Sequence, residues 1–156
     1  GFDDRTITSA GVRAQIGCHE GFFMSKGSKE CFKIFMDLPR SWYDSKKKCK
    51  AEGLLTAMPS DAVAVSLRKD LLEKYGEVCN VWLDARGNGS KMVWQHDRTE
   101  LRDNNSLWWP GSRGVTISHC LFLAVWETDR NRHPRRPYGS NSCSNSFYTL
   151  CKVRME

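Results

Sequence analysis

Seven cysteines constrain the fold of this chain more than any other feature of its sequence. They are Cys18, Cys31, Cys49, Cys79, Cys120, Cys143 and Cys151. Zinc sites use close Cys-x-x-Cys pairs or Cys/His clusters, whereas the closest pair here, Cys143 and Cys151, is eight residues apart. Dispersed cysteines in a small chain favour a disulfide framework that forms in an oxidising compartment. We therefore expect a secreted, extracellular protein or the ectodomain of a surface protein.

The composition agrees with a single folded domain. Hydrophobic residues make up 40% of the 156 residues and aromatic residues 11%, which is enough to fill a core and excludes general disorder. No apolar run approaches the roughly 20 residues of a membrane span, so we expect no transmembrane segment in this chain. The first residues contain no apolar stretch, so any signal peptide is expected to have been removed. Two sequons, at Asn88 and Asn104, are glycosylation candidates.

The pattern of apolar residues predicts two helices followed by several strands. Ser41 is placed to cap a helix that Gly53 ends, and Ser60 to cap a second helix that Gly76 ends. Alternation and short apolar runs predict strands at 31–35, 81–83, 92–94, 121–125 and 147–150. Residues 95–119 show little of the apolar periodicity that is typical of helices or strands, which predicts a long loop. We expect an α+β domain over residues 18–156, preceded by a lead or linker at residues 1–17.

An ordered series of motifs resembles the long form of the C-type lectin-like domain. The segment from Cys18 to Phe22, taken with Cys31-Phe32, resembles the extra N-terminal hairpin, and Ser41-Trp42-Tyr43 through Cys49 resembles the start of the first helix. Val81-Trp82-Leu83-Asp84 is similar to the Trp-Ile-Gly-Leu core strand of the family, and Trp94-Gln95-His96-Asp97 to the Trp-x-x-Asp turn after it. Cys120, Cys143 and Cys151 fall where the last three family cysteines fall. The resemblance spans about residues 18–153 and implies two helices, short antiparallel sheets and a long disulfide-stapled loop region.

The resemblance also implies a disulfide connectivity, which the sequence alone leaves open among many pairings. It pairs Cys18 with Cys31, Cys49 with Cys151, and Cys120 with Cys143, and it leaves Cys79 over. A buried free thiol is one interpretation of Cys79. We favour the other, an intermolecular bridge to a second copy or another subunit, because an odd cysteine in a secreted protein often forms one. The same resemblance makes Trp42, Trp82 and Trp94 core residues.

Sugar-binding members of the family hold Ca²⁺ through oxygen ligands from three places, and this sequence lacks the usual ligands at all three. Where the family has Glu-Pro-Asn or Gln-Pro-Asp, residues 111–114 read Gly-Ser-Arg-Gly. Ser118-His119 replaces the acidic residue before the third cysteine, and Tyr138-Gly139-Ser140 replaces Trp-Asn-Asp. Ca²⁺ needs six to eight oxygen ligands, several from carboxylates, and a guanidinium repels it. We expect no Ca²⁺ at the sugar site and no other cofactor.

A basic segment between Cys120 and Cys143 is the main candidate for ligand binding. This interval spans 23 residues and contains four arginines, Arg130, Arg132, Arg135 and Arg136, with two prolines. The guanidinium suits sulfate, phosphate and carboxylate groups, and Arg113 extends the patch if the two loops lie together. A solvated loop that merely tolerates charge is the other interpretation. The lysines of the first helix, Lys46, Lys47, Lys48 and Lys50, cover too much of its circumference to form a stripe, and we assign most of them to solubility.

The sequence favours binding over catalysis. The histidines at 19, 96, 119 and 133 have no Ser, Cys or Asp near them in a known catalytic motif, so we expect that the protein is not an enzyme. Nucleic acid is not an expected partner, because the sequence contains no motif with a DNA-recognition helix. Our first hypothesis is calcium-independent recognition of an anionic glycan or microbial surface, in innate immunity or as an agglutinin. The alternative is a protein-interaction or receptor-like module that uses Trp108, Trp109 and Trp126 as hydrophobic anchors, and a third is a disulfide-linked subunit joined through Cys79.

Overall fold

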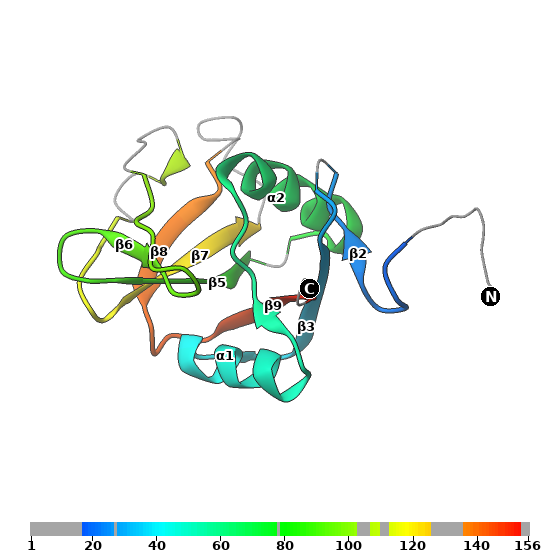
Figure 1. The fold of residues 1–156 in the computed structure, drawn as a ribbon, viewed down its shortest axis with the longest axis horizontal. Helices are drawn as coiled ribbons and strands as arrows, with labels where there is room; N and C mark the ends of the chain where they lie inside the picture. The colour runs from blue at the N-terminus through cyan, green and yellow to red at the C-terminus, as the bar shows by residue number, and fades with distance from the viewer. Residues whose placement is uncertain are drawn as a thin grey trace.

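The structure, a computed structural model, describes residues 17–26, 28–77, 79–102, 107–109, 113–125 and 136–153, with the backbone alone for Cys79. The expected lead at residues 1–17 lies almost wholly outside these residues. Two helices, α1 (Trp42–Ala51) and α2 (Asp61–Tyr75), lie on either side of the central strands in the view of Figure 1. The strands are β2 (Phe23–Met24), β3 (Cys31–Arg40), β4 (Leu55–Thr56), β5 (Cys79–Gly87), β6 (Met92–Trp94), β7 (His119–Val125), β8 (Tyr138–Ser142) and β9 (Phe147–Lys152).

The strands of the described residues form one mixed sheet rather than separate antiparallel ones. Its order is β2-β3-β9-β5-β7-β8, with β4 added on β9 and β6 on β5. All strand pairs are antiparallel except β5 with β9, which run parallel through Val81 opposite Tyr148 and Trp82 opposite Thr149. The expectation of short antiparallel sheets missed this pair. A parallel pair needs a long crossover connection, so no local pattern in the sequence announces it.

Both helices begin and end where the sequence predicts. The Ser41 hydroxyl accepts a hydrogen bond from the backbone N–H of Asp44 at 3.1 Å, which satisfies one free donor in the first turn of α1. Ser60 caps α2 in the same way through the N–H of Val63, at 3.4 Å. Gly76 follows α2 with φ +76°, a conformation that side-chain-bearing residues rarely adopt.

Strand β7 is buried on both faces and divides the core in two. Leu121, Leu123 and Val125 belong to the larger cluster, which also contains residues of α2, whereas Phe122 and Ala124 belong to a smaller cluster with Trp42 of α1. Alternate side chains of a strand point to opposite faces, which is why one continuous apolar run serves both clusters. The sheet therefore separates the two helices, and each helix covers one of its faces.

The three tryptophans that the resemblance assigns to the core are buried. Trp42 is 4% exposed, Trp82 0% and Trp94 7%. The indole N–H of Trp42 donates to the carbonyl of Leu83 at 2.8 Å, and that of Trp82 donates to the carbonyl of Arg40 at 2.9 Å. These bonds tie α1 to β5, and β5 to the end of β3, because a buried indole N–H needs an acceptor.

Three disulfides staple the described residues, and they join the same pairs that the resemblance implies. Cys18–Cys31 closes a separation of 13 residues, Cys120–Cys143 one of 23, and Cys49–Cys151 one of 102. The longest links α1 to β9, and Cys120–Cys143 holds the start of β7 to the turn after β8. The backbone of Cys79 begins β5, opposite Val125 of β7.

The predicted strands are present, most of them longer than predicted, and the described residues contain three further strands, β2, β4 and β8. β2 and β4 have two residues each, too few to give a period in the sequence. β8 was missed because Tyr138-Gly139-Ser140-Asn141-Ser142 contains only one apolar residue, yet it pairs with β7 over its whole length. In the part of the chain that the structure describes, no helix has the length and apolar character needed to cross a membrane.

Candidate functional site

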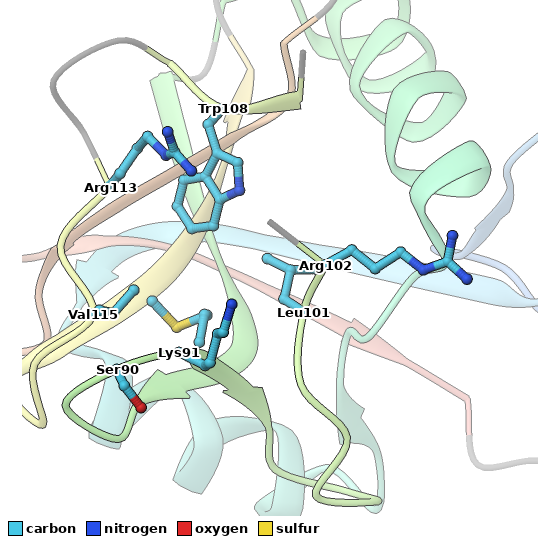
Figure 2. Close-up of a pocket in the computed structure, with 8 residues that line it drawn as sticks. Ser90, Lys91, Leu101, Arg102, Trp108, Arg113 and Val115 are labelled. Atoms are coloured by element: carbon cyan, nitrogen blue, oxygen red, sulfur yellow. The ribbon is translucent and has the colours of Figure 1, made fainter. Parts of the chain in front are cut away.

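A basic pocket lies between the turn that joins β5 to β6 and the described residues of the long loop (Figure 2). Its cavity measures about 220 Å³. The basic residues on its wall are Lys91, Arg102 and Arg113. The remaining wall consists of Ser90, Met92, Leu101, Trp108 and Val115. We call this cavity the loop pocket.

Trp108 forms the buried wall of the loop pocket. Its side chain is 4% exposed, and its backbone pairs with Tyr138 of β8 in an isolated parallel bridge. The two rings lie 6.1 Å apart between centroids. Its indole N–H is buried and has no hydrogen-bond acceptor among the described residues. In Figure 2 the indole nitrogen lies on the side of Leu101 and Arg102. This enclosed nitrogen is a point at which the wall of the cavity lacks an acceptor among the described residues.

Two of the predicted site arginines meet at Trp108, from different segments of the chain. The guanidinium carbon of Arg113 lies 5.8 Å from the centre of the Trp108 ring, within the range of a cation–π contact. Nη1 of Arg136 donates to the backbone carbonyl of Trp108 at 3.0 Å. The structure therefore brings the long loop and the end of the basic segment together. It gives Arg136 a bond to the backbone behind the pocket, whereas Arg113 lines the pocket itself.

The other predicted site residues lie outside the loop pocket or outside the described residues. Trp109 is half-buried and packs against the smaller core cluster, so neither tryptophan of the pair is a free surface anchor. Arg130, Arg132, Arg135 and Trp126 lie outside the described residues, as does the glycosylation candidate Asn104. Asn88 stands in the β5–β6 turn, where its side-chain oxygen accepts from the N–H of Ser90 at 2.9 Å and of Lys91 at 2.8 Å.

Sequence reasoning missed Lys91 and Arg102, which complete the charge of the loop pocket. Each is a single basic residue outside any charged run, so the sequence contains no signal that singles it out. The tertiary structure places both on the same cavity as Arg113, and none of the described residues that line it is acidic. Basic groups in a concave site with an apolar wall attract an anion more strongly than the same groups on a flat surface. The arrangement suits a small anionic group attached to a body that packs on Trp108.

Tyr138 packs against Trp108, which forms the wall of the loop pocket, and is hydrogen-bonded to α2. Its hydroxyl donates to Oδ1 of Asp61, the first residue of α2, at 3.1 Å. Burial raises the pKa of Tyr138 far above the usual value for a tyrosine, and the neighbouring Asp61 carboxylate adds to the effect. Tyr138 is fully buried, so this bond fixes β8, and with it Trp108, against the helix.

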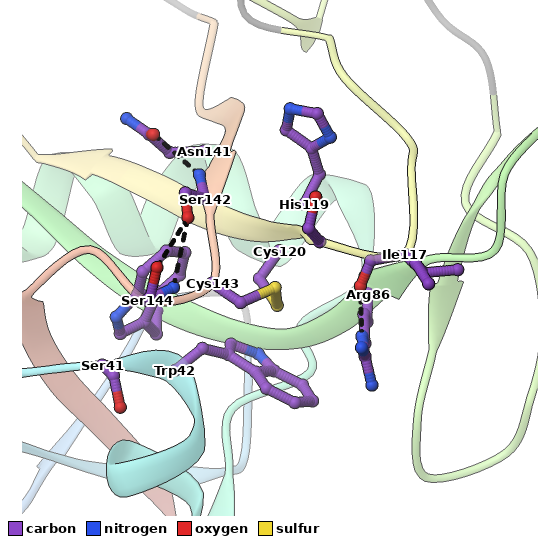
Figure 3. The surroundings of a disulfide bond; sticks show 12 residues. Ser41, Trp42, Arg86, Ile117, His119, Cys120, Asn141, Ser142, Cys143 and Ser144 are labelled. Atoms are coloured by element: carbon purple, nitrogen blue, oxygen red, sulfur yellow. Dashed lines mark hydrogen bonds between the residues drawn. A yellow bond between two sulfur atoms is a disulfide. The ribbon is translucent and has the colours of Figure 1, made fainter.

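The donor set at the family's calcium positions does not fit Ca²⁺. Of the three places, residues 110–112 lie outside the described residues. At the second, Nδ1 of His119 lies 2.6 Å from the Thr116 hydroxyl. Figure 3 shows His119 next to the Cys120–Cys143 disulfide. At the third, Tyr138 is bonded to Asp61, and Gly139 packs so closely on Phe122 that a Cβ would lie 2.3 Å from the ring. Neither described place supplies a carboxylate, the ligand that Ca²⁺ prefers.

His96 and Asp84 form a close histidine–carboxylate pair that lacks the geometry of a catalytic site. Nδ1 of His96 lies 2.6 Å from Oδ2 of the fully buried Asp84, whose other oxygen is paired with Lys46. The second ring nitrogen of His96 lies 3.1 Å from the backbone carbonyl of Thr56. A catalytic histidine presents that nitrogen to a nucleophile, which a carbonyl oxygen is not.

Comparison with known proteins places the fold. No protein-family model and no curated protein matches the sequence. Among solved structures, SPL-1 in complex with GlcNAc is similar with a TM-score of 0.64 and 18% identity, over 87% of this chain and 94% of that one. The Ca²⁺-independent C-type lectin SPL-2 from Saxidomus purpuratus is similar with a TM-score of 0.64 and 18% identity, over 87% of this chain and 93% of that one. Human lithostathine is similar with a TM-score of 0.65 and 16% identity, over 89% of this chain and 92% of that one. These matches confirm the resemblance at the level of the fold, and the chain is a C-type lectin-like domain in structure.

Proposed function

We propose that this chain is an extracellular binding protein that recognises an anionic glycan without calcium, and that the loop pocket holds the ligand. The observation that carries the proposal is that Lys91, Arg102 and Arg113 line one cavity whose wall includes the buried ring of Trp108, with the guanidinium of Arg102 extending away from that ring (Figure 2). Arginine binds sulfate and carboxylate groups through paired N–H donors, and an aromatic ring packs against the C–H face of a sugar.

The size of the cavity sets the size of the ligand. Ligand pockets commonly exceed roughly 300 Å³ for drug-sized molecules. The loop pocket, at about 220 Å³, suits one sugar unit with its sulfate or carboxylate group. A longer glycan then extends over the surface beyond the pocket. Such a ligand is found on sulfated, sialylated or bacterial surface glycans.

The similar structures agree with this role and with its independence from calcium. SPL-1 was solved with GlcNAc, and SPL-2 is described as Ca²⁺-independent. The three disulfides of the described residues agree with an extracellular location, because disulfides persist in oxidising compartments. We infer that the chain acts by binding rather than by catalysis. The alternative role as a protein-interaction module loses two of its expected anchors, since the Trp108 ring is buried and Trp109 packs half-buried against the smaller core cluster.

Binding to an array of neutral, sulfated, sialylated and bacterial glycans tests the proposal. The array is run in Ca²⁺ and in EDTA, each at two salt concentrations. We expect binding to acidic glycans that survives EDTA and falls as salt rises, because salt screens exposed charges. The double variant R102Q/R113Q should weaken this binding about tenfold or more, since each charge-assisted hydrogen bond contributes about 1.5 kcal/mol or more.

The matched control is K69Q/K74Q, which removes the same charge from exposed positions on α2. Equal binding by R102Q/R113Q and K69Q/K74Q would remove the loop pocket as the site. Binding that disappears in EDTA would show a calcium-dependent lectin instead. An array with no signal would point to a protein ligand.

A further inference from the structure

A second basic pocket lies on the face of the molecule formed by α1, away from the residues of the loop pocket. It has a cavity of about 340 Å³ between α1, the segment that leads into β4, and the turn after β6. Its basic residues are Lys46, Lys47 and Lys50 of α1 and His96 of the turn. Leu54, Leu55 and Thr56 supply the rest of its wall. We call it the helix pocket, and it shares no residue with the loop pocket.

The lysines of α1 divide into two groups by their surroundings in the structure. Lys48 lies apart from this cavity, because its ammonium pairs with Glu52 at 3.1 Å and lies 4.8 Å from the centre of the Phe35 ring. Lys46, Lys47 and Lys50 stand at i, i+1 and i+4 of the helix and turn toward one cavity. Lys50 follows Lys46 by four residues and Lys47 by three, the two spacings at which side chains are neighbours on a helix surface, so Lys50 lies next to both.

A buried carboxylate fixes two of the basic groups on this wall. Asp84 is completely buried, with one oxygen against the ammonium of Lys46 and the other 2.6 Å from Nδ1 of His96. Both groups are held in place because a buried carboxylate is very unfavourable without partners. The Nε2 atom of His96 is held by the Thr56 carbonyl at 3.1 Å. The inner end of the helix pocket is therefore rigid before any ligand arrives.

Lys47 and Lys50 supply the charge that Asp84 does not balance. Both are exposed, and neither lies within ion-pair distance of a carboxylate among the described residues. None of the described residues that line the helix pocket is acidic. The buried carboxylate beside it, Asp84, is already shared between Lys46 and His96. Among the described residues, the cavity consequently has an excess of positive charge and no internal counter-ion for it.

The apolar wall limits what kind of anion fits. Leu54 and Leu55 are half-buried, so part of the cavity surface is apolar and favours contact with an apolar group over contact with water or a hydrated ion. Lysine ammonium groups bind phosphate and sulfate as point charges rather than through a planar fork. We propose that the helix pocket is a second anion site that takes a sulfate or phosphate ester on a sugar-sized body. The oxyanion contacts Lys47 and Lys50, and the C–H face of the body packs on the two leucines.

Titration followed by NMR tests this site without reference to the loop pocket. The probes are glucose 6-sulfate, glucose 6-phosphate and inorganic phosphate, each at constant ionic strength, with glucose as the uncharged comparison. We expect saturable shifts of the His96 ring resonances and of the Leu54 and Leu55 methyl groups with both esters. Glucose should produce none, and inorganic phosphate should bind at least severalfold more weakly than the phosphate ester, because it lacks the apolar body.

Two double variants separate this site from the proposed function. K47Q/K50Q should abolish saturation at His96, whereas the control K69Q/K74Q and the loop-pocket variant R102Q/R113Q should leave it unchanged. Saturable shifts at His96 that persist in K47Q/K50Q would overturn the proposal, as would ester titrations that shift only residues of the loop pocket. The normal backbone spectrum of K47Q/K50Q is the check on folding, and it is expected because both lysines are exposed and unpaired.

Discussion

Arg136 donates a hydrogen bond to the backbone carbonyl of Trp108 at 3.0 Å, and this bond joins two segments that are 28 residues apart in the chain. It connects the start of β8 to the residue that forms the wall of the loop pocket. The position of Trp108 therefore depends on a residue that the sequence presents only as part of a charged run.

The Arg136 bond is expected to contribute to stability as well as to ligand affinity. R136M should lower the free energy of unfolding by about 1–2 kcal/mol, because it removes a charged donor from a half-buried carbonyl. R136K keeps the charge and is expected to lose less stability than R136M. Urea denaturation of the three proteins gives the comparison. Equal stabilities of R136M and the parent protein would contradict the structural role assigned to this bond.

The unpartnered indole N–H of Trp108 is expected to matter for binding and not for folding. Replacing Trp108 by 3-benzothienylalanine exchanges the N–H for sulfur and keeps the shape of the ring. Stability should stay the same or rise slightly, since a buried donor without an acceptor opposes folding. Affinity for an acidic glycan should fall about threefold to tenfold if a ligand oxygen accepts this bond, at roughly 0.5–1.5 kcal/mol per hydrogen bond.

Loss of the indole N–H must lower the affinity for the glycan without lowering stability if the pocket assignment is to hold. Thermal unfolding measures stability, and calorimetric titration with the best glycan of the array measures affinity. A loss of stability without a loss of affinity would mean that the N–H serves the fold. Binding that is unchanged in the isosteric variant would show that the ligand does not use this donor.

Tyr138 makes stability depend on pH in the alkaline range. Because burial and Asp61 raise the pKa of Tyr138 in the folded protein, the folded chain keeps the phenol proton after the unfolded chain has lost it. Its contribution is therefore complete below the unfolded pKa of about 10 and declines as pH rises above it. The decline should approach about 1.4 kcal/mol per pH unit for this one group.

Comparison with Y138F isolates that contribution from the other alkaline groups, including Tyr75, whose pKa burial also raises. The difference in unfolding free energy between the parent and Y138F should be constant up to about pH 9 and then shrink as pH increases. Denaturant titrations at a series of pH values measure it. A difference that stays constant through pH 11, about one unit above the usual pKa of tyrosine, would contradict the raised pKa.

The three disulfides are expected to stabilise the fold in the order of the loops that they close. Chain entropy predicts about 5 kcal/mol for Cys49–Cys151, with its separation of 102 residues, and about 3 kcal/mol for Cys18–Cys31, with its separation of 13. Cys-to-Ala pairs and chemical denaturation give the values. If the C18A/C31A protein were the less stable of the two, local packing rather than loop closure would set the order.

The sequence by itself determined the helices, most strands and the pairing scheme that the resemblance implies. Ser41, Ser60 and Gly76 act on their nearest neighbours, so their capping roles can be read locally, as can the apolar runs at 92–94 and 121–125. The series of tryptophans and cysteines identified the C-type lectin-like fold. It also pointed to Arg113 and to Trp108, which line the loop pocket.

Only the tertiary structure decided which residues share a site. Lys91 and Arg102 join Arg113 because the β5–β6 turn and the long loop fold against each other, and no local pattern encodes that approach. The same holds for the parallel pairing of β5 with β9, for β8, and for the three lysines that meet His96 on one cavity. Burial of Trp108 follows from its contact with Tyr138, a partner 30 residues away. Local physical chemistry sets elements and caps, whereas pockets arise from contacts between segments that the chain order keeps apart.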